Sequence, residues 1–167
     1  MSNNKHQLKL VTLPAENLRE PSEKVKFPLS RDFQRLLAEM LRICRKSKGV
    51  GIAAPQVGVN LQVVIINLEH LKVPPFPLIN PKIQKYSAKK LLLEEGCLSV
   101  PGKFAKVERA EKVDVVAYDP KGKKLEFKAD GFLAHVIQHE VDHINGMLFV
   151  DRLSKAERDE LTKEFYG

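Results

Sequence analysis

The stretch GFLAHVIQHEVDHIN, residues 131–145, most constrains the fold of this chain. Asp130 precedes it and can cap the N-terminus of a helix, while Gly146 follows it and can end one. The apolar surface of this helix continues into a row of histidines, which favours burial. We therefore predict a central, buried helix over these residues. Its apolar positions run as far as the histidines and are Phe132, Leu133, Val136 and Ile137.

Within this helix, HEVDH places His139 and His143 four residues apart. Residues at this spacing lie about 6 Å apart along the axis and on one face, so both imidazoles can bind one metal ion. Glu140 is rotated about 100° from His139, which suits it to act on a metal-bound water rather than as a ligand. His135 lies about 12 Å from His143 along the axis and cannot share the ion, so we expect it to line a neighbouring pocket.

The histidine pair needs a third ligand, because catalytic sites of this kind have three protein ligands. Asp151 could complete a protease-like site, although only 24 residues, 144–167, follow the pair. The other candidate is Cys97 in EEGCLSVPG, at an expected strand end between Gly96 and Pro101. Alone, Cys97 would be interpreted as an inert buried thiol. Beside a histidine pair that lacks a partner, we favour it as the third ligand.

Two further helices are predicted from their caps. Ser30 can cap a helix with an apolar stripe that stops near Gly49, and Cys44 belongs to that stripe. SKAE, residues 154–157, is a capping-box pattern that opens a last helix with a narrow apolar face. We interpret the apolar stripe of the first of these helices as core packing.

Strands are predicted between these helices. LQVVIINL (61–68) reads as a buried strand, and VPPFPLINP (73–81) as a surface turn that enters one. Residues 106–119 alternate in polarity and, with KKLEFKAD (123–130) after a turn signal, predict a hairpin. Since βαβ alternation is scarce, we predict an α+β fold with mixed or antiparallel sheets packed around the central, metal-binding helix.

Composition limits the kind of protein. With 167 residues, 43% of them hydrophobic, we expect one domain, residues 1–167. No apolar run approaches the roughly 20 residues that cross a bilayer, and MSNNKHQLKL is unlike a signal or transit peptide, so a soluble, cytoplasmic protein is expected. Two cysteines are too few for a disulfide framework. The net charge of +7 is scattered and mainly solvates the surface, with weak attraction to polyanions.

Three segments, in this order, resemble motifs of the peptide deformylases: GVGIAAPQVG (49–58), EGCLS (95–99) and QHEVDH (138–143). The resemblance extends over nearly the whole chain and implies the fold of that family. It implies one divalent metal held by Cys97, His139 and His143, with Fe²⁺ in the cell and Zn²⁺, Ni²⁺ or Co²⁺ as substitutes. It also implies removal of the formyl group from N-formyl-methionyl nascent peptides, with release of formate.

The resemblance further implies catalytic roles. Glu140 would move the proton of the attacking water, while the side-chain amide of Gln56 and the backbone N–H of Leu98 would donate to the developing oxyanion. Backbone at Gly51 and Gly96 would pair with the extended substrate. The remaining substrate-binding positions match the family pocket for the methionine side chain and are Val50, Leu93, Phe132, His135 and Val136.

In this setting Asp142 is expected to pair with Arg109 and orient the metal-binding helix. Two other functions stay open. A zinc peptidase built on the helix alone would remain active without Cys97 and would cleave internal peptide bonds. A non-catalytic basic module, such as a ribosome-associated protein, would bind no metal. A deformylase could itself bind the ribosome weakly through its basic surface. We expect a monomer that does not bind membranes.

Overall fold

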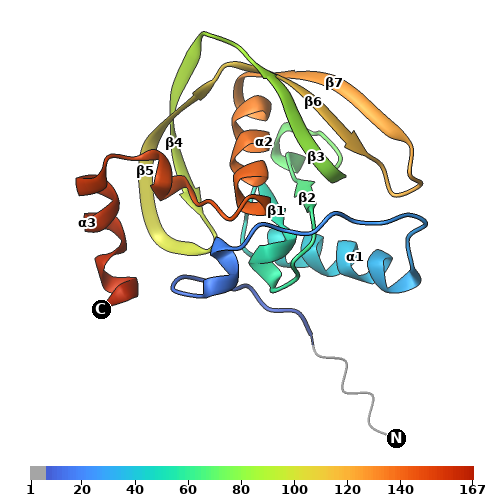
Figure 1. Ribbon diagram of the computed structural model, residues 1–167, viewed down its shortest axis with the longest axis horizontal. Helices are drawn as coiled ribbons and strands as arrows, with labels where there is room; N and C mark the ends of the chain where they lie inside the picture. Colours follow the sequence, from blue (N-terminus) through green and yellow to red (C-terminus); the bar gives the residue numbers. More distant parts are fainter. Residues whose placement is uncertain (1–6) are drawn as a thin grey trace, which may run out of the picture.

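The structure is a computed structural model that describes residues 7–167. Its two sheets enclose helix α2 (Gly131–Ile144), which is seen in Figure 1 between β4 and β5 on one side and β3, β6 and β7 on the other. The smaller sheet pairs β4 (Lys90–Cys97) with β5 (Val100–Ala110). The larger sheet has the strand order β1 (Gly51–Ala53), β2 (Val63–Ile66), β3 (Phe76–Tyr86), β6 (Lys112–Tyr118) and β7 (Lys124–Asp130).

Every pairing between these named strands is antiparallel, which confirms the predicted α+β class. The other helices lie outside the two sheets. They are α1 (Arg31–Lys46), α3 (Lys155–Tyr166) and the short 3-10 helices η1 (Glu16–Arg19), η2 (Ala54–Val57), η3 (Glu69–Leu71) and η4 (Phe149–Arg152). Within residues 7–167, no helix combines the length and the apolar character needed to cross a membrane.

The prediction of a central buried helix is confirmed. All residues of α2 from Ala134 to Ile144 are buried, and Ile137 and Val141 pack with residues of the larger sheet such as Val64 and Leu78. Burying apolar side chains on such a helix is the main favourable contribution to folding. The first turn differs, because Phe132 remains 42% exposed.

The prediction that the Asp130 side chain caps α2 is wrong. Asp130 occupies the N-cap position but makes no side-chain capping hydrogen bond. The residue also ends β7, where it pairs with Lys112, and Gly131 then turns the chain with a φ of +54°. The predicted caps of the other two helices are confirmed, since Ser30 Oγ accepts the Phe33 N–H at 3.2 Å and Ser154 forms a capping box.

Residues 106–119 do not form one strand, contrary to the simplest interpretation of their alternation. The chain crosses between sheets at Glu111, so Val107 and Arg109 pair with β4 while Val113 pairs with β7. The hairpin of β6 and β7 is confirmed. The predicted turn over 73–81 is shorter than expected, because β3 already begins at Phe76. A strand's partner is chosen by tertiary packing, which local alternation does not encode.

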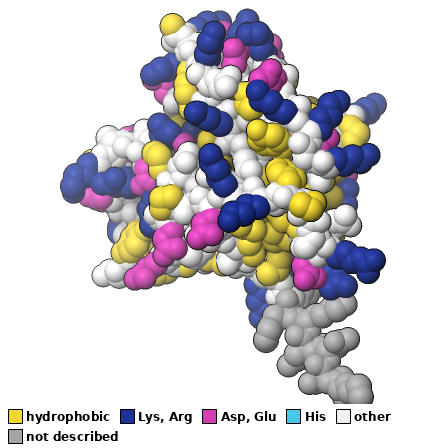
Figure 2. Space-filling view, turned by 45° about the vertical axis from the view of Figure 1, so that its right-hand side comes forward, with side chains coloured by type: hydrophobic (Ala, Val, Ile, Leu, Met, Phe, Trp, Pro, Cys, Tyr) yellow, Lys and Arg dark blue, Asp and Glu magenta, His cyan; other side chains and the backbone are white. Residues whose placement is uncertain are grey.

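The surface carries many cationic side chains. Figure 2 shows Lys and Arg spread over the face turned forward, with hydrophobic side chains exposed between them. The cations do not gather there into one compact patch. This distribution agrees with the scattered charge of the sequence.

Gly146, just past the end of α2, combines a positive φ with a lack of room for a side chain. Gly146 and Gly102 both have a φ of +75°, but a Cβ at Gly146 would lie 2.5 Å from the carbonyl oxygen of Arg19, whereas one at Gly102 would meet nothing within 4 Å. Both alanine variants should lose about 1–2 kcal/mol from the positive φ. We expect Gly146→Ala to lose about 1–3 kcal/mol more from overpacking, measured by urea unfolding. Equal losses in the two variants would contradict the clash.

Candidate metal centre

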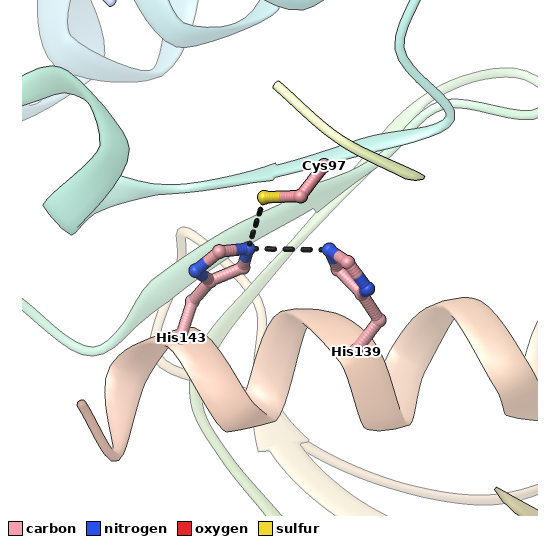
Figure 3. Close-up of side chains that lie close together, drawn as sticks. All are labelled: Cys97, His139 and His143. Carbon is pink, nitrogen blue, oxygen red and sulfur yellow. Dashed lines mark hydrogen bonds between the residues drawn. The ribbon is translucent and has the colours of Figure 1, made fainter. Parts of the chain in front are cut away.

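Cys97, His139 and His143 meet at one point between β4 and α2 (Figure 3). Cys97 Sγ lies 3.3 Å from His143 Nε2, which lies 3.2 Å from His139 Nε2. The two histidines share a face of α2 because of their four-residue spacing. The β4–β5 register shifts between Gly96 and Cys97, and such irregularities re-aim side chains at the ends of paired strands. The predicted third ligand, Cys97, is therefore brought to the histidines.

This donor set fits a divalent metal. A thiolate and two imidazoles suit Zn²⁺ and its first-row neighbours, and tetrahedral ligands about 2.0–2.3 Å from an ion stand roughly 3.3–3.6 Å apart. The ligand atoms here lie within 4.8 Å of one another. Asp151, the alternative ligand, is engaged elsewhere, because it accepts the Leu148 N–H at 2.8 Å and pairs with Arg19. The structure therefore contains a Cys/His/His metal-binding site.

Glu95 holds the centre in place, and no role was predicted for it. Its Oε1 lies 3.2 Å from His139 Nδ1 and accepts from Arg109 Nε at 2.7 Å. A carboxylate on the outer nitrogen of a ligand histidine fixes the orientation of the ring. Arg109 Nη1 also donates to Asp142 at 2.8 Å, which confirms the predicted Arg109–Asp142 pair. The signal in the sequence was the acidic pair Glu94–Glu95, which ends two residues before Cys97 in an expected strand.

The same contacts keep Glu95 charged. Burial by itself raises the pKa of its carboxyl group, but His135, His139 and Arg109 outweigh burial and hold the pKa well below its usual range. His135 Nε2 lies 3.3 Å from Glu95 Oε1. An ionised carboxylate at neutral pH therefore stands behind the metal ligands.

Glu140 has the opposite environment. Its side chain is buried on α2, and Oε2 has no hydrogen-bond partner. Burial raises the pKa of Glu140 to about 7, against the lowering effect of His139. A Cβ at Gly51 would lie 2.6 Å from Glu140 Oε1, so a glycine is needed there to leave room for the carboxylate. The arrangement provides a carboxyl group able to exchange a proton near neutral pH.

Gln56 presents a fixed amide to the metal centre. Its Oε1 accepts the Ala53 N–H at 2.9 Å, and its Nε2 donates to Ser99 Oγ at 3.1 Å and lies 3.6 Å from Cys97 Sγ. The side chain is 1% exposed, so these contacts determine its orientation. Ser99 was part of a recognised motif but had no predicted role. It orients the amide of Gln56.

A cavity of about 560 Å³ opens beside the metal centre. Most of the predicted site residues line it, together with unpredicted ones such as Phe104. Two predicted site residues, Leu93 and His143, are not among the lining residues. Leu93 lies farther back on β4, opposite Val107 in the register. The predicted residues that do line the cavity are Val50, Gly51, Gln56, Gly96, Cys97, Leu98, Phe132, His135, Val136, His139 and Glu140.

Glu95→Gln should weaken metal binding. The variant keeps the shape of the side chain but removes the charge that contacts His139 and balances Arg109. We expect a 10- to 100-fold loss of Zn²⁺ affinity, measured by competition with a chelator. Glu108→Gln, an equal change at an exposed position of β5, serves as the control. Unchanged affinity in Glu95→Gln would refute the positioning role.

Glu140→Gln should change how the stability of the metal-free protein depends on pH. A carboxyl pKa raised from 4.5 to about 7 contributes stability that is fully present below pH 4.5 and is lost as the pH rises through 7. Chelator-treated Glu140→Gln should therefore melt at a higher temperature than chelator-treated wild type near pH 8. The difference should shrink near pH 5. A difference independent of pH would exclude the raised pKa.

Comparison with known proteins adds independent findings. Residues 7–159 match the family model described as polypeptide deformylase. The chain is 42% identical to a peptide deformylase of Synechococcus sp. (strain CC9605), over 94% of this chain and 78% of that protein. It is 40% identical to a peptide deformylase of Hydrogenovibrio crunogenus, over 95% and 93% of the two chains.

Solved structures agree with the fold. A peptide deformylase from Synechococcus elongatus in complex with actinonin superposes with a TM-score of 0.88 at 40% identity, covering 96% of this chain and 89% of that one. A peptide deformylase from Legionella pneumophila also gives a TM-score of 0.88 at 40% identity, covering 95% and 93%. The similarity thus includes the folds as well as the sequences.

Proposed function

The chain belongs to the polypeptide deformylase family, and from this premise we propose the role of each residue at its metal centre. The protein is a metal-dependent hydrolase that removes the formyl group from the N-terminus of newly synthesised polypeptides. The observation that carries the assignment of roles is the convergence of Cys97, His139 and His143 beside a cavity. The lining of that cavity includes Cys97, His139, Glu140 and Gln56.

Cys97, His139 and His143 would hold one divalent cation, which when bound lowers the pKa of water and polarises a carbonyl group. We propose Fe²⁺ as the metal used in the cell, on the strength of the family resemblance. Zn²⁺, Ni²⁺ or Co²⁺ would substitute, because one thiolate and two imidazoles suit all of these ions. A thiolate beside ferrous iron is open to oxidation, so activity should decline in air.

Glu140 is the proton carrier in this proposal. As the water oxygen adds to the formyl carbon, Glu140 accepts a water proton, and when the C–N bond breaks it delivers that proton to the amine nitrogen. The products are formate and a free amino terminus. A pKa of about 7 and an unpartnered Oε2 support this role, because a carboxyl group near neutrality can accept and return a proton.

Gln56 and Leu98 stabilise the charge that develops on the former carbonyl oxygen. The amide of Gln56 is held by Ala53 and Ser99 with Nε2 directed to the site, and the backbone N–H of Leu98 follows the ligand Cys97. Donors fixed before the reaction lose no reorientation energy at the transition state. Removing one such donor costs about 100-fold or more in turnover.

Substrate binding is proposed to use the two strand edges beside the cavity. Strand β1 is the edge of the larger sheet, and β4 pairs with β5 alone among the described strands. Both Gly51 of β1 and Gly96 of β4 line the cavity, so an extended peptide can add to either edge. The methionine side chain would enter the slot lined by Val50, Phe132, His135 and Val136.

We propose that the chain acts as a monomeric, single catalytic domain in the cytoplasm, with N-formyl-methionyl nascent peptides as partners. The net charge of +7 and the cations spread over the face in Figure 2 support an additional weak affinity for ribosomal RNA. Such binding should weaken steeply as the salt concentration is raised. If the amount of protein that cosediments with ribosomes did not depend on salt concentration, this affinity would be contradicted.

The proposed roles can be tested by anaerobic purification, metal analysis and an assay of formate released from a formyl-methionyl peptide. Glu140→Gln should lower turnover at least about 100-fold and keep its metal, because Glu140 is not a ligand. Cys97→Ala should lose both metal and activity. Glu108→Gln is the control, because Glu108 is exposed and does not line the cavity.

The same variants distinguish the other functions. A peptidase built on α2 alone would keep its activity in Cys97→Ala and would cleave internal peptide bonds. A non-catalytic module would contain no metal and release no formate. Full activity in Glu140→Gln would overturn the role of that residue while leaving the metal site intact.

A further inference from the structure

Phe104 is an aromatic side chain that the core does not use. It is 62% exposed, more than any other large hydrophobic side chain among residues 7–167, and it lines the cavity. It belongs to none of the three apolar clusters that make up the described core. A ring left in water forgoes hydrophobic stabilisation, so the rim of this cavity offers apolar surface that a ligand can cover.

The ring of Phe104 lies across Gly96. These residues face each other in the β4–β5 register, and a Cβ at Gly96 would come within 2.5 Å of Phe104 Cε1 and 2.7 Å of Cδ1. The ring therefore occupies the space that a side chain at position 96 would fill. Its partner in the register, Gly96, directly precedes the metal ligand Cys97.

The two faces of β4 are distinguished by Glu95. Its side chain contacts His135 and His139, so this position faces α2. Successive side chains of a strand point to opposite faces, so Gly96 and its cross-strand neighbour Phe104 lie on the face directed away from α2. Phe104 therefore borders the cavity from the face of the sheet opposite to the one that carries the methionine slot.

An added peptide must follow the same alternation. Its formyl end lies at the metal centre, near the C-terminal end of β4, so it runs antiparallel to that strand along the unpaired edge. If the methionine side chain points to α2, the side chain of the second residue points away from it. That side chain then comes to the face that carries the ring of Phe104.

We propose that Phe104 is a specificity-determining residue that contacts the side chain of the second residue of the substrate, the one after formyl-methionine. The inference rests on the proposed function and on strand addition to β4. An apolar or aromatic second residue covers the exposed ring, whereas glycine leaves it in water. The protein therefore processes formyl-methionyl chains with an apolar second residue faster than those with glycine.

A purely structural role for Phe104 makes a different prediction. Aromatic rings cover glycines in neighbouring strands and stabilise the pairing without any ligand. In that case the loss of the ring lowers the melting temperature and slows all substrates by one factor. A purely structural role leaves the ratio of kcat/KM between two substrates unchanged. A change in that ratio therefore distinguishes a contact with substrate from a structural role.

The test compares kcat/KM for two anaerobically assayed formyl-methionyl peptides that differ only in leucine or glycine at the second position. Wild type should favour leucine about fivefold or more, and Phe104→Ala should bring the ratio close to one. Phe104→Tyr should keep most of the preference. The matched control is Leu92→Ala, because Leu92 is 59% exposed on the same face of β4 but does not line the cavity.

The outcomes separate the two levels of the proposal. An unchanged leucine-to-glycine ratio in folded Phe104→Ala, or no preference in wild type, would overturn the role of Phe104 while formate release continued. Absence of formate release from any formylated peptide by metal-loaded wild type would instead overturn the proposed function. An equal loss of preference in Leu92→Ala would show that the β4–β5 pair as a whole, and not Phe104, sets the leucine-to-glycine ratio. That result would also overturn the proposal.

Discussion

The buried guanidinium of Arg109 joins the parts of the molecule that carry the metal ligands. Arg109 belongs to β5, and it binds Glu95 of β4 and Asp142 of α2. Cys97 is two residues from Glu95, and His143 directly follows Asp142. Through these two carboxylates, Arg109 positions the thiol and the imidazoles of the metal centre. Buried ion pairs of this kind contribute little net stability, but losing one partner leaves an uncompensated charge. The network fixes geometry more than it adds to the free energy of folding.

Two glutamates 45 positions apart in the chain, Glu95 and Glu140, show how environment divides one residue type into two roles. Arg109 and two imidazoles keep Glu95 ionised, while Glu140, buried without a hydrogen bond to Oε2, has its pKa raised to about 7. Carboxyl groups whose pKa values are pushed apart are typical of hydrolytic sites. Here the ionised one orients a metal ligand, and the other is free to exchange a proton.

The parts of the site that depend on helix geometry could be predicted from the sequence. The four-residue spacing of His139 and His143 places them on one face wherever the helix lies, and the same argument excluded His135 as a ligand. Cys97 was favoured as the third ligand because the histidine pair lacked one, whereas the Arg109–Asp142 pair depended on the resemblance of segments far apart in the chain. The capping of α1 and α3 also followed from local residues.

The parts that depend on strand partners could not be predicted. The chain crosses from one sheet to the other at Glu111, and alternation alone gives no sign of this. The position of Leu93 outside the cavity and the contact of Glu95 with His139 follow from the register of β4 with β5, which tertiary packing decides. Gly131 likewise redirects the chain after Asp130, so a residue of suitable type did not make the expected cap.

The edge of β4 beside the cavity limits the time during which a new chain can bind there. An open strand edge accepts only backbone that is still free to extend, because its N–H and C=O groups must be available for pairing. A client whose first residues have already coiled into a helix, or joined a sheet of their own, offers no such groups. On the proposed strand addition to β4, access to this enzyme is limited by how soon each substrate chain begins to fold, and chains whose first residues fold slowly stay accessible longest.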